Sequence, residues 1–383
     1  MTPPARLLDV TRTLRRAGRW PTGVDRVELA YAKALLKAEP PVFALARTRL
    51  GYVLLDRTGL RAFVKAVEAL PPPKDALRAL RKLALARTWP PGLGRMLETH
   101  LPKGTNYFNV GHSNLTERVL GSVSRFLSGK TVVLVHDIIP LLAPELQREG
   151  TVGPFEQKMR RVGRYADLVI ANSQDTKAQL DGVFAQWGYS PDIVVAHLGV
   201  ELAEPAPLDL SDRARVDGPY VVALGTIEPR KNHAFLLDLW QEMGPDAPYL
   251  MIVGQRGWNN ETVFDRLDAL PSDGRVRELG SLSDGAIRSL LEGSHGLVFP
   301  SKIEGFGLPA LEAAALGVPV LVNDLPVFKE TLGNIAIYAP VSDRYLWIKE
   351  VNNLKNINRQ MGSDPAFEPP TWSDHFKTVL SLG

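Results

Sequence analysis

Four charged residues lie in or beside apolar segments of the second half of the chain: Arg230, Lys231, Glu304 and Glu312. The run 308–316 is apolar on nearly every helical face, so it is predicted to form a buried helix that contains Glu312. Glu304 precedes this helix in the glycine-rich run EGFG. A buried carboxylate without a partner is unfavourable, so each glutamate is expected to have a hydrogen-bonding or ionic partner.

The start of the predicted helix has the features of a phosphate site. Gly305 and Gly307 leave backbone amides bare before the helix begins at Leu308 or Pro309, and a helix N-terminus attracts anions. Glu312 lies about 6 Å further along the axis, at about 1.5 Å per residue, where a carboxylate suits the two hydroxyls of a ribose. Glu304 would lie on the other side of the phosphates, beside a sugar joined to them.

Arg230 and Lys231 follow a predicted strand that ends at Gly225. An arginine fork and a lysine point charge at a strand end suit a diphosphate, although a solvated basic turn has the same composition. Two further strand ends are less specific. Gly254, in IVGQRGWNN, permits close approach of a ligand or a tight turn, and the loop at Leu282, before a predicted N-cap at Ser283, could contact a nucleobase through its backbone.

The elements that must position these residues alternate between short apolar strands and amphipathic helices, which predicts parallel α/β sheets. The chain of 383 residues favours two domains. The proline-rich run 198–219 is typical of a linker, so we expect doubly wound domains at 1–200 and 201–365, with ligands at the carboxyl ends of strands. A last helix at 366–383 is expected to pack back towards the first domain. Predicted strands are 131–136, 167–172, 192–197, 219–226, 249–254 and 295–301, and predicted helices include 233–243 and 283–293.

Composition excludes several classes of function. The chain has no cysteine, which excludes disulfides and thiolate chemistry and fits a reducing cytoplasm. The N-terminus lacks the apolar stretch of a signal peptide, and no run approaches the roughly 20 apolar residues that span a bilayer. A net charge of +3 is too small to indicate nucleic acid as a partner.

The charge is nevertheless uneven, because 47–103 holds twelve Lys/Arg and four Asp/Glu. The stretch 75–87 within it is predicted to be a basic amphipathic helix. Such a helix either covers the core with a solvated face or contacts an anionic membrane surface.

The pattern E-G-F-G-L-P-x-x-E-A, with glutamates eight residues apart, resembles the donor-site signature of GT-B-fold retaining glycosyltransferases of family 4. The resemblance extends over nearly the whole chain through the runs at 21–27, 134–145 and 170–180. GTIEPRKN, GQRGW and PAFEPPTWSDHF are similar to a subgroup of polysaccharide mannosyltransferases. The resemblance implies two Rossmann-like domains facing a central cleft.

The resemblance also implies roles for individual residues. Glu304 would contact hydroxyls of the donor sugar and Glu312 the ribose, while Arg230 and Lys231 neutralise the leaving diphosphate. Many relatives place an arginine directly after the strand-end glycine, where this chain has Thr226, so the guanidinium role passes to Arg230. His136 would touch the donor sugar; the alternative is a structural histidine. The remaining implied residues are Gly23, Gly254, Leu282, Gly305, Phe306, Gly307 and Leu308 for the donor, and Asp25, Arg26, His112 and Asp137 for the acceptor side. Asp9, on the first apolar strand, is expected to be structural.

By resemblance, the chain is a hexosyltransferase in surface polysaccharide synthesis. It would move a sugar from a nucleotide-diphosphate donor, with GDP-mannose or a related GDP-sugar favoured, to a saccharide or lipid-linked saccharide, with retention. No cofactor is expected, and no metal, because the sequence has no Asp-x-Asp pair. The expected location is the cytoplasm, with peripheral contact at the inner membrane face through 47–103. The alternatives are a non-transferring GT-B enzyme, such as a nucleotide-sugar epimerase, and a silent donor-binding subunit.

Overall fold

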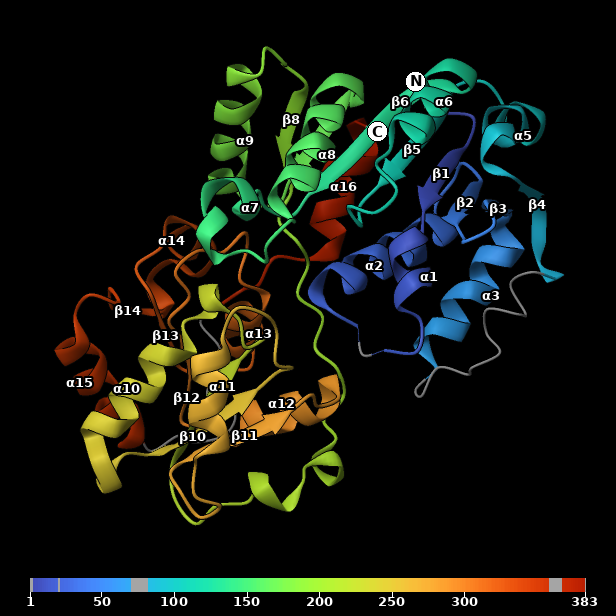
Figure 1. Ribbon diagram of the computed structural model, residues 1–383. Coiled ribbons are helices and arrows are strands. Elements are labelled where there is room, and N and C mark those ends of the chain that lie inside the picture. Colours follow the sequence, from blue (N-terminus) through green and yellow to red (C-terminus); the bar gives the residue numbers. More distant parts are fainter. Residues whose placement is uncertain (1–2, 20, 70–81, 358–366, 383) are drawn as a thin grey trace. The chain divides into compact units, whose positions relative to one another are not determined.

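A computed structural model describes residues 3–19, 21–69, 82–357 and 367–382 (Figure 1). The chain forms two compact units. The first comprises 1–138, 153–198 and 372–383, and the second comprises 139–152 and 199–371. The segment 139–152, which the sequence places in the first domain, therefore groups with the second unit. Hydrogen bonds explain this grouping, because Trp258 Nε1 and Asn259 Nδ2 donate to the carbonyls of Leu146 and Gln147 at 3.4 and 2.8 Å.

The described part of the first unit contains one eight-stranded sheet, in the order β4-β3-β2-β1-β5-β6-β7-β8. Its strands are β1 (Arg6–Asp9), β2 (Val42–Arg47), β3 (Tyr52–Leu55), β4 (Ala84–Thr88), β5 (Thr105–Asn109), β6 (Ser128–Val135), β7 (Leu168–Ala171) and β8 (Asp192–Val195). β3 pairs antiparallel with both β2 and the edge strand β4, and the other pairings of this sheet are parallel. The helix predicted over 75–87 is wrong at its end, because residues 84–88 pair with β3; residues 75–81 lie outside the described residues.

The helices of the first unit connect these strands. They are α1 (Thr11–Arg16), α2 (Gly23–Lys37), α3 (Arg57–Glu68), α5 (Leu93–His100), α6 (Glu117–Phe126), α8 (Val152–Tyr165), α9 (Gln174–Gln186) and α16 (Trp372–Leu382). The C-terminal helix α16 packs within this unit: the Nε2 of His375 lies 2.7 Å from the hydroxyl of Tyr31, and its Nδ1 lies 2.9 Å from the His197 carbonyl oxygen.

The second unit contains a six-stranded sheet among its described residues, in the order β11-β10-β9-β12-β13-β14, and all of its pairings are parallel. Its strands are β9 (Tyr220–Leu224), β10 (Tyr249–Val253), β11 (Val276–Gly280), β12 (Gly296–Phe299), β13 (Val320–Val322) and β14 (Ile337–Tyr338). Its helices are α7 (Ile139–Leu142), α10 (His233–Met243), α11 (Glu261–Asp268), α12 (Asp284–Glu292), α13 (Leu308–Ala315), α14 (Pro326–Leu332) and α15 (Arg344–Lys355). Both sheets confirm the doubly wound α/β class.

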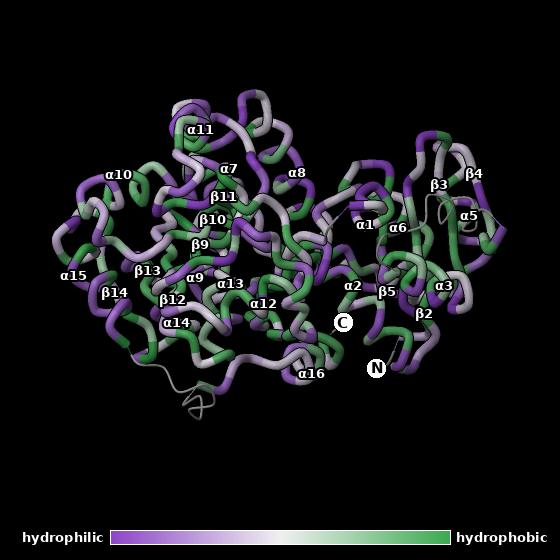
Figure 2. Tube along the Cα trace, turned by 90° about the horizontal axis from the view of Figure 1, so that it is seen from below, coloured by the Kyte–Doolittle hydropathy of each residue, from purple (hydrophilic) through white to green (hydrophobic). Residues whose placement is uncertain are grey.

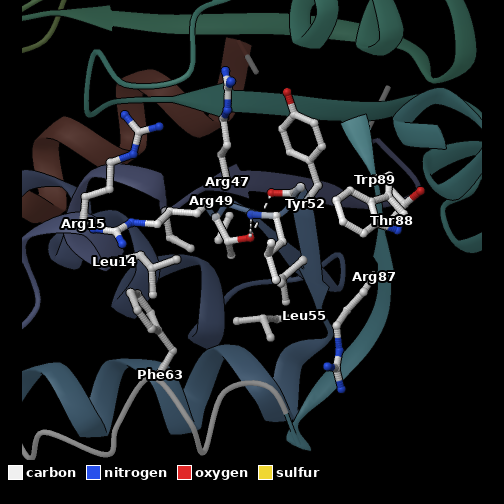
Figure 3. A pocket seen from close by; sticks show the side chains of 16 residues that line it. Leu14, Arg15, Arg47, Arg49, Tyr52, Leu55, Phe63, Arg87, Thr88 and Trp89 are labelled. Atoms are coloured by element: carbon white, nitrogen blue, oxygen red, sulfur yellow. Dashed lines mark hydrogen bonds between the residues drawn. The ribbon is translucent and has the colours of Figure 1, made fainter. Parts of the chain in front are cut away.

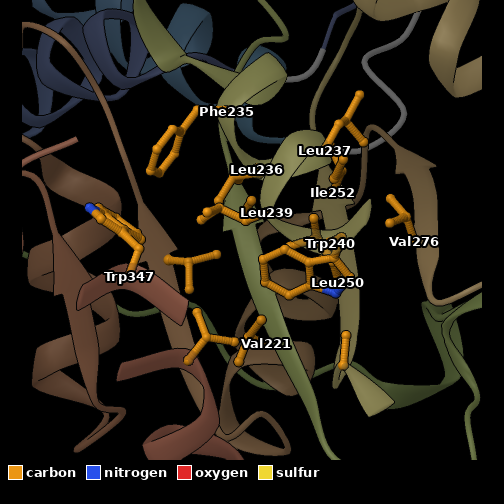
Figure 4. Packing of buried hydrophobic residues seen from close by; sticks show 14 of the residues in the cluster. Val221, Phe235, Leu236, Leu237, Leu239, Trp240, Leu250, Ile252, Val276 and Trp347 are labelled. Atoms are coloured by element: carbon orange, nitrogen blue, oxygen red, sulfur yellow. The ribbon is translucent and has the colours of Figure 1, made fainter. Parts of the chain in front are cut away.

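A large apolar cluster packs on the second sheet (Figure 4). Leu236 and Leu239 of α10 pack on the strands, and Trp347 of α15 meets Phe235 edge to face at 5.4 Å between ring centroids. The indole of Trp347 donates to the Ala339 carbonyl at 2.9 Å, so its polar atom is satisfied within the core. Figure 2 shows α10 and α15 changing between hydrophobic and hydrophilic residues along their length, as expected for helices with one buried face.

The order of the second sheet has one consequence for function. The chain runs outwards from β9 through β10 to β11 and then returns to add β12 on the other side of β9. Ligands of doubly wound sheets bind at the carboxyl ends of strands where the order reverses. The loops after β9 and β12, at 225–232 and 300–307, therefore meet at such a switch point.

Among the residues that the structure describes, no helix has the length and apolar character needed to cross a bilayer. Part of the basic region 47–103 lies outside the described residues.

Candidate active site

Glycines end the strands beside the switch point and allow their loops to approach closely. Gly225 and Gly254 follow β9 and β10 with φ angles of 140° and 154°. The amide of Gly225 donates to the Val253 carbonyl at 2.9 Å, and that of Gly254 to the Gly280 carbonyl at 2.8 Å. A Cβ on Gly254 would lie 1.9 Å from the carbonyl oxygen of Gly225, so only glycine fits there. The absence of a side chain at Gly254 therefore lets the backbones after β9 and β10 pack against each other.

The switch point brings three of the predicted residues into one cluster. Lys231 Nζ lies 2.5 Å from Glu304 Oε1, and an Arg230 guanidinium nitrogen lies 2.9 Å from Glu304 Oε2. Lys231 also lies over the ring of Phe299, with its ammonium 4.2 Å from the centroid. The carbonyl of Arg230 accepts a 2.8 Å bond from the Lys302 amide, which joins the two loops through the backbone. Glu304 is therefore held by both cations.

Glu228, which was not among the residues predicted from the sequence, completes the cluster. Its Oε1 lies 2.5 Å from Arg230 Nε, and only 2% of Glu228 is exposed. The guanidinium of Arg230 therefore lies between two buried carboxylates. An acidic residue two positions before the Arg-Lys pair, in the loop that follows a buried strand, was the available signal.

Burial and charge act in opposite directions on this cluster. Burial alone would raise the pKa of Glu304, but the charges of Arg230 and Lys231 outweigh it and lower the pKa to about 2. Burial raises the pKa of Glu228, which Arg230 only partly offsets. Burial lowers the pKa of Lys231, and the attraction of Glu304 opposes that shift. Glu304 is thus the firmly ionised carboxylate of the cluster.

The two glutamates of the EGFGLPALE run occupy different elements. Glu304 lies in the loop and Glu312 in α13, as predicted, and both are at least nine-tenths buried. Gly307 caps α13 in the left-handed conformation, with φ 87° and ψ 39°, and a Cβ on it would lie 2.5 Å from a ring carbon of Phe328. Pro309 falls in the first turn of α13. The switch point, the helix start and the cations are thus brought together.

The other predicted donor residues surround the same loops. Phe306 is 4% exposed, so its ring packs in the core and only its backbone is positioned for a ligand. Gly305, Leu308 and Leu282 are half-buried, and Leu282 lies between β11 and α12, directly before the N-cap Ser283. The hydroxyl of Ser283 accepts from the Ala286 amide at 3.1 Å, which confirms that predicted cap.

Two histidines of the first unit lie together at the end of β6. The rings of His112 and His136 are 5.0 Å apart, and the His136 amide donates to His112 Nε2 at 3.1 Å. His136 Nε2 lies 2.7 Å from the Val110 carbonyl oxygen, which can only accept, so Nε2 carries the proton and Nδ1 carries a lone pair. Burial lowers the pKa of His136 to about 4, and burial also lowers the pKa of His112. Both imidazoles are therefore neutral near pH 7.

The predicted acceptor-side residues near α2 have partners within the first unit. Asp25 is 3% exposed; it accepts from the Thr22 amide at 2.7 Å and pairs with Arg12 and Arg16 at 2.8 and 2.7 Å. This arrangement is a capping box between Thr22 and Asp25 at the start of α2, with two arginines paired to Asp25. Its contribution to acceptor binding stays a prediction. Gly23 is exposed in the first turn of α2, Arg26 is half-buried beside it, and Asp137 is half-buried after β6.

Two buried carboxyls lie at the first-unit switch point, between β1 and β5. Asp9 accepts from the Thr11 amide, Asn114 Nδ2 and the Tyr107 hydroxyl at 3.0, 2.7 and 3.0 Å, a fully structural set of contacts. Glu28 was not identified from the sequence: it is 2% exposed and accepts from the Thr13 amide at 2.9 Å. Burial raises the pKa of Glu28 to about 8, so its carboxyl is largely protonated at neutral pH.

Comparison with known proteins gives one family match. Residues 211–351 match the family described as glycosyl transferases group 1. The chain is 33% identical over 221 residues to the serotype-specific mannosyltransferase WbdA of Escherichia coli, covering 54% of this chain and 27% of WbdA. It is 27% identical over 225 residues to the O-antigen chain mannosyltransferase B of Escherichia coli, covering 56% of this chain and 58% of that protein. The chain therefore spans only about a quarter of WbdA.

Solved structures agree over nearly the whole chain. HepE of Anabaena, crystallised with UDP-glucose, superposes with a TM-score of 0.64 at 17% identity, covering 98% of this chain and 94% of HepE. The sucrose-phosphate synthase of Thermosynechococcus elongatus gives a TM-score of 0.57 at 16% identity, covering 99% and 94%. These similarities show the fold, which is GT-B.

Proposed function

We propose that this chain, whose residues 211–351 form a glycosyl transferases group 1 domain on a GT-B fold, transfers a hexosyl group from a nucleotide-diphosphate sugar to a saccharide acceptor in polysaccharide synthesis. The observation that carries the proposal is the buried cluster of Arg230, Lys231 and Glu304 at the switch point, next to the start of α13.

The cluster suits the departure of a nucleoside diphosphate. Bond cleavage places negative charge on the leaving phosphates, and preorganised cations and a helix N-terminus stabilise that charge as it develops. Lys231 is buried and fixed between Glu304 and Phe299, so little reorganisation is needed to present its charge. These groups can neutralise the diphosphate without a metal ion, and metal-independent transfer is part of the proposal.

Glu304 has two tasks in this proposal. Its two oxygens orient Lys231 and Arg230, and as an ionised carboxylate it retains lone pairs that can accept from hydroxyls of the donor sugar. Glu312, inside α13, is assigned to the ribose. The lone pair on His136 Nδ1 can accept from a hydroxyl of the donor sugar, because Nε2 is engaged by Val110.

The favoured donor is GDP-mannose or a related GDP-sugar. The support is the similarity to WbdA and to the O-antigen chain mannosyltransferase B, whose names specify mannosyl transfer. HepE is described with UDP-glucose, so a UDP-sugar is the comparison to include. Retention of the anomeric configuration and a saccharide or lipid-linked acceptor remain parts of the proposal.

A thermal-shift screen with GDP-mannose, GDP-fucose, UDP-glucose and a dTDP-sugar tests donor binding. A ligand at 100 times its dissociation constant adds about 2.7 kcal/mol to the free energy of unfolding. We expect one donor to stabilise the wild type and the Lys302→Met variant equally, and Lys231→Met less at the same donor concentration. Lys302 is the matched control, because it is an exposed lysine in the adjoining loop 300–307. Stabilisation of none of these proteins by any nucleotide sugar would refute the proposal.

Turnover separates transfer from the alternatives. A transferase releases nucleoside diphosphate in proportion to glycosylated acceptor, measured with added chelator to test metal independence. An epimerase would convert the donor without stoichiometric release, and a silent subunit would bind the donor without turnover. Either of these outcomes would overturn the assignment as a transferase.

A further inference from the structure

The first unit contains a pocket of about 900 Å³ whose two sides differ in chemistry (Figure 3). Arg15, Arg47 and Arg49 gather on one side, and Leu14 and Phe63 lie on the other. Arg87 also lines the pocket but points away from the other three arginines. No acidic residue is present among the described residues that line it.

The β2–β3 turn holds two of these arginines in place. Thr48 donates through its amide to the Gly51 carbonyl at 2.8 Å, which closes the turn between Arg47 and Tyr52. A Cβ on Gly51 would lie 2.1 Å from the Thr88 carbonyl oxygen, so the turn is packed directly against the end of β4. The Arg47 amide donates to the Thr11 hydroxyl at 3.0 Å. The backbone that carries Arg47 and Arg49 is therefore fixed by these hydrogen bonds and contacts.

These arginines differ from their neighbours because no described acidic group pairs with them. Arg12 and Arg16, on either side of Arg15 in the helical region, both pair with Asp25. Arg15, Arg47 and Arg49 have no ion pair within the described residues. Gathering like charges is unfavourable unless an anion neutralises them. The pocket thus combines uncompensated guanidinium groups with an apolar wall.

We propose that this pocket binds a phosphate ester of an apolar chain. Guanidinium forks match phosphate oxygens in geometry and charge, which favours a phosphate on the arginine side. Leu14 is half-buried, and Leu50 and Trp89, which also line the pocket, are 61% and 68% exposed, so covering these side chains with an apolar substituent gains free energy. Neither a free phosphate nor a neutral hydrocarbon uses both sides. The volume also lies in the range of ligand-binding pockets.

The pocket and His136 lie at the same end of the sheet, where the parallel strands have their carboxyl ends. Arg47 ends β2 and His136 follows β6; the two strands run parallel and are separated by β1 and β5. Three strand spacings of about 4.8 Å place the two positions about 15 Å apart across that end of the sheet. If the proposed function holds, on which this step rests, the pocket would bind the phosphate-linked carrier end of a lipid-linked acceptor and the saccharide would extend towards His136.

Calorimetric titration with geranyl monophosphate, below its critical micelle concentration, tests the pocket directly. Geraniol and inorganic phosphate are the two partial ligands. We expect geranyl monophosphate to bind the wild type more tightly than either partial ligand does. Arg47→Gln and Arg49→Gln should each weaken it by about tenfold to a hundredfold, the range for loss of a charged hydrogen bond. Arg95→Gln is the matched control, because Arg95 is exposed on α5 and does not line the pocket.

Several outcomes would overturn the proposal. Inorganic phosphate binding as tightly as the ester would reduce the pocket to an anion site, and geraniol binding as tightly would make the arginines irrelevant. Equal weakening by Arg95→Gln would indicate only a general charge effect. Unchanged thermal midpoints must show that the variants are folded. If the ester fails to bind while a nucleotide sugar still does, only the pocket proposal fails; the reverse result refutes only the proposed function.

Discussion

Replacing Lys231 by methionine isolates the charge at the centre of the candidate site. Methionine keeps an unbranched apolar side chain and removes the ammonium, which lies 2.5 Å from Glu304 and 4.2 Å from the Phe299 ring centroid. If that ammonium stabilises the departing diphosphate, its loss should lower kcat by about a hundredfold to a thousandfold, the cost of removing one preorganised group from a charged transition state. Single-turnover measurement of sugar transfer, with saturating donor, reports this step.

The same substitution should lower the free energy of unfolding by a smaller amount. Removing one partner of a buried ion pair costs about 3–5 kcal/mol when the other charge is left alone. Glu304 retains Arg230 at 2.9 Å, so we expect a loss of about 1–3 kcal/mol, measured by urea denaturation. Lys302→Met provides the control, with a change within about 0.5 kcal/mol expected for an exposed site.

A double-mutant cycle with Glu304→Gln tests whether the two groups act together. Their stability losses should not add, because the double variant removes both buried charges, and a coupling of about 1–3 kcal/mol is expected. The activity losses should also be non-additive, since both groups serve one step. Near wild-type transfer by Lys231→Met, with the protein folded and donor saturating, would refute the assignment of Lys231 to the leaving group.

Three further predictions concern pH and glycine. The Glu304 pKa of about 2 lies below its ordinary 4.5, so ionised Glu304 should stabilise the fold by about 3 kcal/mol above pH 4.5, and this stabilisation should be lost as the pH falls to 2. Denaturation at each pH should therefore show a shrinking stability difference between the wild type and Glu304→Gln. Glu28, with a pKa of about 8, should destabilise the fold as pH rises from 4.5 to 8, and Glu28→Gln should remove that slope; an unchanged slope would contradict its burial as an acid. Gly307→Ala should lower the free energy of unfolding more than Gly333→Ala does, and it should also weaken donor binding. Both glycines have positive φ, but only at Gly307 would the added Cβ lie 2.5 Å from the Phe328 ring, so equal thermal midpoints would argue against that contact.

Secondary structure was largely predictable, because the strands of parallel sheets are short apolar runs and the helices carry a clear period. The helix 233–243 was predicted with the bounds that α10 has. The error at residues 84–88 has a physical cause. The run LALAR has good helix formers, but pairing with the exposed edge of β3 overrides that preference, as tertiary context often does.

Candidate residues at strand ends were also predictable, because charged groups and glycines there are unusual in type. The groups with which these residues pair could not be predicted from the sequence. Asp25 and Arg26 were predicted for the acceptor side, yet the structure shows Asp25 accepting from the Thr22 amide and pairing with two arginines. The buried carboxyl of Glu28 carried no local signal, because its neighbours along α2 are also part of an ordinary helical pattern.

The sequence by itself determined the elements, their α/β class, and the positions of Arg230, Lys231, Glu304 and Glu312 relative to strand ends and a helix start. Only the tertiary structure decided that Glu304 binds both cations, that Glu228 joins them, and that three arginines of the first unit gather on one side of a pocket. The reason is the order of the strands: β12 returns beside β9, so residues 73 positions apart in the chain form a 2.5 Å contact. Local patterns specify strands, but their order depends on the packing of the whole unit.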